Sequence, residues 1–103
     1  MYLITNQHDR TLIGAGRDRH STWIDLICAD SPGYENFYKA AYELIGGMDA
    51  RPHLGKWVQM VDSSDLEKLH QHHFQKFQKI VDDHDPEGKF TNPFTRRVLG
   101  TKD

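Results

Sequence analysis

The sequence has no long apolar segment and only one cysteine, Cys28. A single cysteine cannot form an internal disulfide, so the sequence is compatible with a reducing compartment, and the apolar run around Cys28 indicates a buried structural thiol. No apolar run approaches the roughly 20 residues of a membrane-spanning helix. The N-terminus has no basic segment followed by a long apolar core, so no signal peptide is predicted. We therefore expect a cytoplasmic protein without a membrane span.

A strong excess of either charge is also missing. Lys and Arg number 13 and Asp and Glu 15, for a net charge of -2 with neutral histidines. This balance gives no electrostatic reason to expect nucleic acid or an anionic membrane as a partner. The 103 residues are enough for one domain with a modest core. The Gly14-Ala15-Gly16 stretch lacks the strand, helix and downstream acid of a dinucleotide-binding fingerprint.

The residues that are present predict an α+β fold. Short β-prone runs predict strands over 2–5 and 22–28, and a further extended segment is expected over 56–61. Apolar residues at three- and four-residue spacing predict two main helices, one over 34–45 and one from about residue 64 to just before Pro86. Ser64 with Glu67 resembles a capping box at the start of the second helix. We expect a single domain over 1–103, with two or three antiparallel strands covered by two helices and an extended C-terminal tail that includes a short helix near 95–99.

Two motifs carry a family resemblance. The first is Arg51-Pro52-His53-Leu54-Gly55-Lys56, and the second is the Asp85-Pro86-Glu87-Gly88 turn with the residues that follow it to Gly100. Together with Gly16-Arg17-Asp18 and the helix over 34–47, they resemble the closing part of the FAD-linked sugar-lactone and alditol oxidases. This family includes the arabinonolactone and gulonolactone oxidases, which are flavoproteins of the vanillyl-alcohol-oxidase type. Leu54 stands where the family usually has Trp.

The resemblance implies an oxidoreductase that transfers a hydride from a hydroxyl-bearing carbon of a sugar lactone or polyol to FAD. O2 would then reoxidise the flavin. The chain resembles the end of the oxidase cap domain plus the C-terminal return segment, and the FAD-binding domain is expected to be absent from it. We therefore expect FAD in the complete family enzyme, no FAD bound by this chain alone, and no activity of the isolated chain.

By the same resemblance, Lys56 is the catalytic and cofactor-binding residue, and Arg51 and His53 are site residues that support it. A cation at the position of Lys56 stabilises the negative charge that hydride transfer leaves on a reduced flavin. The residues alone leave simpler roles open. Lys56 can be a solvated lysine, and Arg51 can be an ion-pair partner of Asp18 or Asp49.

His70, His72 and His73 form a second group of chemically capable residues. His70 and His73 are three residues apart, and such a pair on a helix can bind Zn²⁺ or Ni²⁺. A third ligand on the same face is missing from the sequence, so no metal site is predicted.

Two other functions are compatible with the sequence. The family places a Glu-x-Arg pair on the strand before the Gly16-Arg17-Asp18 loop, whereas residues 1–5 contain neither Glu nor Arg. This departure favours a non-catalytic assembly or binding module derived from such an oxidase. The chain could also be the small subunit of a split oxidase. The expected partner is a second copy in a homodimer or a separate flavin-binding subunit.

Overall fold

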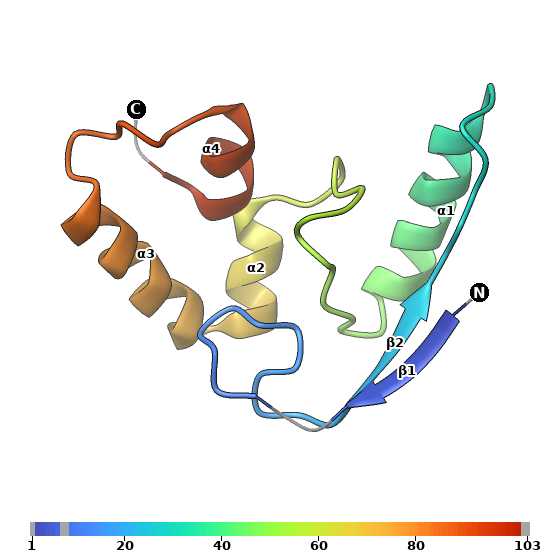
Figure 1. The fold of residues 1–103 in the computed structure, drawn as a ribbon, viewed down its shortest axis with the longest axis horizontal. Helices are drawn as coiled ribbons and strands as arrows, with labels where there is room; N and C mark the ends of the chain where they lie inside the picture. Colours follow the sequence, from blue (N-terminus) through green and yellow to red (C-terminus); the bar gives the residue numbers. More distant parts are fainter. Residues whose placement is uncertain (1, 7–8, 102–103) are drawn as a thin grey trace.

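The computed structural model describes residues 2–6 and 9–101. Its elements are two strands and four helices, and Figure 1 shows how they are arranged. The bounds are β1 Tyr2–Asn6, β2 Ser21–Asp25, α1 Tyr34–Gly46, α2 Ser63–His70, α3 His72–His84 and α4 Pro93–Leu99. The predicted α+β class with a small antiparallel sheet is confirmed. Within the described residues, no helix has the length and apolarity needed to cross a membrane.

The sheet contains two antiparallel strands, with Tyr2 opposite Asp25 and Asn6 opposite Ser21. The third extended segment, predicted over 56–61, forms turns instead. Arg97 explains the difference, because its guanidinium donates to the carbonyl oxygens of Val58 and Gln59, which a neighbouring strand would otherwise use. The segment nevertheless contributes Val58 and Val61 to the core.

The helices also differ in arrangement from the prediction. Figure 1 shows the sheet and α1 at one end of the molecule and α2, α3 and α4 at the other, with loop 9–20 beneath α2. Helix α2 packs against α3 and α4 rather than over the sheet. The C-terminal tail is therefore partly helical, because α4 folds back onto α2.

The single helix predicted from residue 64 to Pro86 is divided at Gln71 into α2 and α3. Gln71 has φ 52 and ψ -130, which no helix interior allows. The predicted capping box of Ser64 and Glu67 was wrong by two positions. The carboxylate of Asp62 accepts from the amides of Ser64 and Asp65, and the Asp65 side chain accepts from the Asp62 amide.

Helix α4 has the sequence signals of a short helix at both ends. Asn92 and Thr95 form its capping box, and Pro93 occupies the first turn, where a missing N–H costs nothing. Gly100 ends the helix in the left-handed conformation, with φ 65. The predicted short helix near 95–99 is confirmed and begins two residues earlier.

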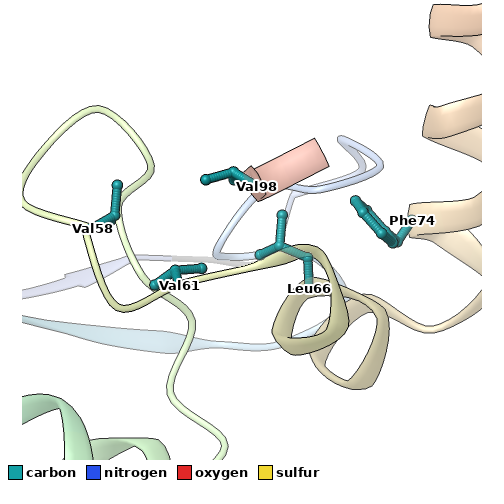
Figure 2. Packing of buried hydrophobic residues seen from close by; sticks show 5 residues of the cluster. All are labelled: Val58, Val61, Leu66, Phe74 and Val98. Carbon is teal, nitrogen blue, oxygen red and sulfur yellow. The ribbon is translucent and has the colours of Figure 1, made fainter. Parts of the chain in front are cut away.

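The core lies at the helical end of the molecule. In Figure 2, side chains from the 58–61 segment, α3 and α4 gather around Leu66 of α2. The buried apolar residues among those described are Val58, Val61, Leu66, Phe74 and Val98. Ile13, Tyr42, Leu54 and Leu99 pack against this cluster. Tyr42 comes from α1, and its hydroxyl donates to Asp65 at 2.8 Å, so the core also connects the two ends of the molecule.

Candidate functional site

The first predicted site residue, Arg51, is directed into the fold. Its guanidinium donates to the carbonyl of Arg17 at 2.7 Å and to that of Leu69 at 3.1 Å. The carbonyls of Gly14 and Ala15 lie at 3.5 and 3.4 Å from the same guanidinium. Burial and the neighbouring Arg19 lower the pKa of Arg51. Arg51 therefore joins loop 9–20 to α2 through backbone carbonyls.

This contact lies at the break between α2 and α3, where Gln71 has a non-helical backbone. In a continuous helix the Leu69 carbonyl would accept from the amide of His73, four residues later. At the break the Arg51 guanidinium donates to this carbonyl, as a basic group commonly does at a helix C-terminus. The predicted ion pairs of Arg51 with Asp18 or Asp49 were wrong. Asp18 pairs with Arg17, and the backbone carbonyl of Asp49 accepts from Arg19.

His53 and Lys56 lie together on one exposed turn. The Lys56 amide donates to the His53 carbonyl at 3.3 Å, and the Gly55 amide donates to His53 Nδ1 at 3.0 Å. The neutral His53 ring consequently carries its proton on Nε2. A Cβ on Gly55 would lie 3.1 Å from His53 Cε1, so the ring is packed closely against this glycine. Trp23 of β2 meets the His53 ring edge to face, with centroids 6.2 Å apart.

The Lys56 side chain is exposed, and no carboxylate in the described part of the chain forms an ion pair with it. Its neighbours are anchored. Leu54 packs on the core, and Trp57 stacks on Tyr38 of α1 with centroids 5.0 Å apart and planes 25° apart. The structure therefore brings His53 and Lys56 together on a turn anchored at both ends, while Arg51, at the start of the segment, binds carbonyls of loop 9–20 and α2 as part of that support.

The histidines of the predicted second group lie at the α2–α3 junction. His73 Nε2 is 3.2 Å from the carboxylate of Asp18, and the rings of His72 and His73 have centroids 4.0 Å apart. His70 is only 4% exposed, and burial together with the positive charge of Arg51 lowers its pKa to about 4. Among the described residues, no group of three or more metal-ligating side chains could hold a metal ion.

Several contacts in this region could not be predicted from any sequence pattern. Trp57 with Tyr38, Trp23 with His53, and Asp18 with His73 each join segments that are distant in the chain. Desolvation opposes ionisation of Asp18, but its hydrogen bonds and charge interactions with Arg17 and His73 give a net lowering of its pKa. Only the Arg51 to Lys56 motif drew attention to the region, and it did so through resemblance.

Comparison with protein families supports that resemblance. The family model of D-arabinono-1,4-lactone oxidase matches residues 4–98. The chain therefore belongs to the D-arabinono-1,4-lactone oxidase family. Comparison with curated proteins and with solved structures gave no match. The match includes all three predicted site residues and both histidine-bearing helices, so the oxidase resemblance extends well beyond a single motif.

Proposed function

We propose that this chain is the C-terminal portion of an FAD-dependent oxidase that acts on a sugar lactone or polyol, with O2 as the electron acceptor. The family match over residues 4–98 is the observation that carries the proposal. The exposed ammonium of Lys56, on a turn that is anchored at both ends, supports it. The chain on its own is expected to be inactive, because the proposal assigns FAD binding to a separate flavin-binding unit.

The turn has the right chemistry for one side of a flavin. FAD, when bound, accepts the hydride and passes electrons on to O2. Lys56 would donate hydrogen bonds and positive charge to the part of the ring system that becomes negative. His53 Nε2–H is a second donor on the same turn. Arg51 would act as a positioning residue, because it holds the start of the segment through the carbonyls of Arg17 and Leu69.

The glycine-containing loop of this chain is poorly suited to hold the FAD pyrophosphate. Asp9 accepts from the Thr11 amide at 3.0 Å, and a Cβ at Gly14 would lie 2.9 Å from the same carboxylate oxygen. The hydrogen bond from Thr11 lowers the pKa of Asp9, so this side chain is ionised near neutral pH and would repel a phosphate. The loop also precedes no helix that offers free amides to an anion.

A chimeric enzyme tests the role of Lys56. Residues 4–98 would replace the matching segment of an active D-arabinono-1,4-lactone oxidase, and H2O2 production would be followed with a sugar lactone and with an alditol. We expect an active chimera. Lys56→Ala should lower kcat by about 10²- to 10³-fold, as loss of one stabilising donor does. Lys76→Ala, which removes an exposed lysine of α3, is the matched control.

Equal activity of the Lys56→Ala and Lys76→Ala chimeras would rule out the assigned role of Lys56. Titration of the isolated chain with FAD, followed by flavin fluorescence, tests the other half of the proposal. We expect no saturable binding. Saturable micromolar binding that Lys56→Ala abolishes would show that the chain holds FAD without a flavin-binding unit.

A second candidate function is a non-catalytic assembly module of the same descent. The observation in its favour is the large exposed apolar surface around α1, which includes Phe37, Leu44 and Met48. An inactive chimera that still folds would favour this function. A gene for a flavin-binding subunit beside that of this chain would instead favour a split oxidase.

A further inference from the structure

Trp57, the residue that follows Lys56, contacts two tyrosines of α1. Its indole stacks on the ring of Tyr38, with centroids 5.0 Å apart and planes 25° apart. Its side chain also forms a hydrogen bond with that of Tyr34, which opposes part of the rise in the pKa of Tyr34 that Glu35 causes. An indole N–H can only donate, so the Tyr34 hydroxyl is the acceptor. The face and the polar edge of the indole therefore both meet α1.

The ring on which Trp57 stacks is itself held by other aromatic side chains of α1. Tyr34 meets Tyr38 edge to face, with centroids 6.2 Å apart, and Phe37 does so with centroids 5.3 Å apart. Tyr34 and Tyr38 are four residues apart, so they lie on the same face of the helix. Edge-to-face pairs of this kind add stability beyond the area that they bury. Trp57 is consequently packed against an aromatic cluster rather than against a single side chain.

Lys56 depends on its backbone for its position. Its side chain is exposed, and no carboxylate among the described residues forms an ion pair with it. On one side, its amide donates to the His53 carbonyl at 3.3 Å. On the other side, the packing of Trp57 on α1 fixes the chain directly after Lys56. A misplacement of about 1 Å can cost on the order of 10²-fold in rate, so this packing affects any reaction in which Lys56 takes part.

We propose that Trp57 is a second positioning residue of the oxidation, in addition to Arg51. By stacking on Tyr38, Trp57 fixes the backbone from which the Lys56 ammonium reaches the flavin. Within the described residues, Trp57 lies outside the buried core cluster around Leu66, so its replacement should loosen the turn without unfolding the helical end of the molecule. This inference rests on the proposed function, since that function gives Lys56 its role.

The isolated chain gives a measurement that does not need activity. The NMR order parameter of the Lys56 amide should be about 0.85 in the unchanged chain and should fall below about 0.6 in Trp57→Leu, because the turn loses its attachment to α1. Trp57→Phe keeps an aromatic face and should retain the order. Phe90→Leu is the matched control, because Phe90 is 81% exposed and lies in the C-terminal segment. The Lys76 amide of α3 should stay rigid in every variant.

Kinetics of the chimera that contains residues 4–98 test whether Trp57 acts through Lys56. Trp57→Leu should lower kcat by about 10-fold with little change in KM, and Trp57→Phe should restore most of the rate. In a Lys56→Ala background, Trp57→Leu should lower kcat no further, because no ammonium remains to be positioned. A residue with a merely structural role would lower kcat by the same factor in both backgrounds, and that result would overturn the proposal.

These measurements separate the role of Trp57 from the proposed function itself. Full activity of the Lys56→Ala chimera would remove the role of Lys56 and would overturn both proposals. A large effect of Lys56→Ala, together with equal effects of Trp57→Leu in the two backgrounds, would overturn only the role of Trp57. An unchanged order parameter of the Lys56 amide in Trp57→Leu would do the same.

Discussion

At the scale of single residues, Arg51 joins parts of the chain that are distant in sequence. Its two nitrogens join a loop more than thirty positions earlier in the chain to the end of α2. Lysine keeps the charge but lacks the planar fork of donors that serves both carbonyls. Arg51→Lys should therefore lower the free energy of unfolding by about 2–4 kcal/mol.

Urea unfolding followed by circular dichroism measures this change, with Arg10→Lys as an exposed control. Equal free energies of unfolding for Arg51→Lys and Arg10→Lys would mean that the hydrogen bonds from the Arg51 guanidinium to the carbonyls of Arg17 and Leu69 do not stabilise the fold.

The buried imidazole of His70 makes stability depend on pH. Its pKa is about 4 in the folded chain and near 6.5 when unfolded. The unfolded chain therefore binds more protons between these values, so stability is full above about pH 6.5 and falls as the pH drops towards 4. We expect a loss on the order of 2–3 kcal/mol across this range. Burial also lowers the pKa of His73, which adds to the same trend.

Unfolding by urea at several pH values measures this dependence. His70→Gln should flatten the slope between pH 4 and 6.5, while His84→Gln, which changes an exposed histidine of α3, should leave it intact. The carboxylates of Asp9, Asp18 and Asp62 have lowered pKa values, so their contribution to acid unfolding begins only below about pH 5 and falls mostly below pH 4. An unchanged slope in His70→Gln would exclude His70 as the responsible group.

At the scale of elements, the end of α4 fixes how three helices meet. Gly100 has φ 65, and a Cβ there would lie 3.0 Å from Gln78 Nε2 of α3 and 3.3 Å from Ser63 Cβ of α2. Gly100→Ala should therefore destabilise the chain by about 1–2 kcal/mol, through backbone strain and crowding. Gly46→Ala is the control, because its Cβ would meet nothing within 4 Å. Thermal unfolding should show a lower Tm for Gly100→Ala only.

The sequence predicted those elements whose signals are local. Helix α1 follows from its apolar spacing and the glycines at its end, and α4 from residues near its own termini. The break at Gln71 was not predictable, because no Gly or Pro marks it and the contact that Arg51 makes there comes from twenty positions earlier in the chain. The segment 56–61 was predicted as a strand from its own residues alone. That pattern could not show that Arg97, far along the chain, donates to the carbonyl of Val58.

For the candidate site, the sequence pointed to residues of the turn but not to the contacts that hold them in place. The motif identified His53 and Lys56, and the structure places them on one turn. It could not show that Arg51 binds the carbonyls of Arg17 and Leu69, because the contacts of a side chain depend on which carbonyls the rest of the fold presents. The stack of Trp57 on Tyr38, which anchors the turn from its other side, depends on the packing of α1.

At the scale of the whole molecule, the structure has two unequal ends. The helical end contains the buried apolar cluster, while the sheet and α1 have no fully buried apolar side chain among the residues whose burial is described. The ends are joined through Tyr42 with Asp65, Trp57 with Tyr38, and the segments between them. This asymmetry is why the candidate turn, which lies between the two ends, depends on both for its shape.

The contacts of Arg51 also set an order for events during synthesis. The carbonyls it binds belong to Gly14–Arg17 and to Leu69, so the loop cannot be fastened to α2 until residue 69 has left the ribosome. At about 5–20 residues per second, some 50 residues separate the appearance of the loop from that of its anchor by about 3–10 s. During this interval loop 9–20 lacks its attachment to α2, and a chaperone that holds extended segments would have its best opportunity to bind.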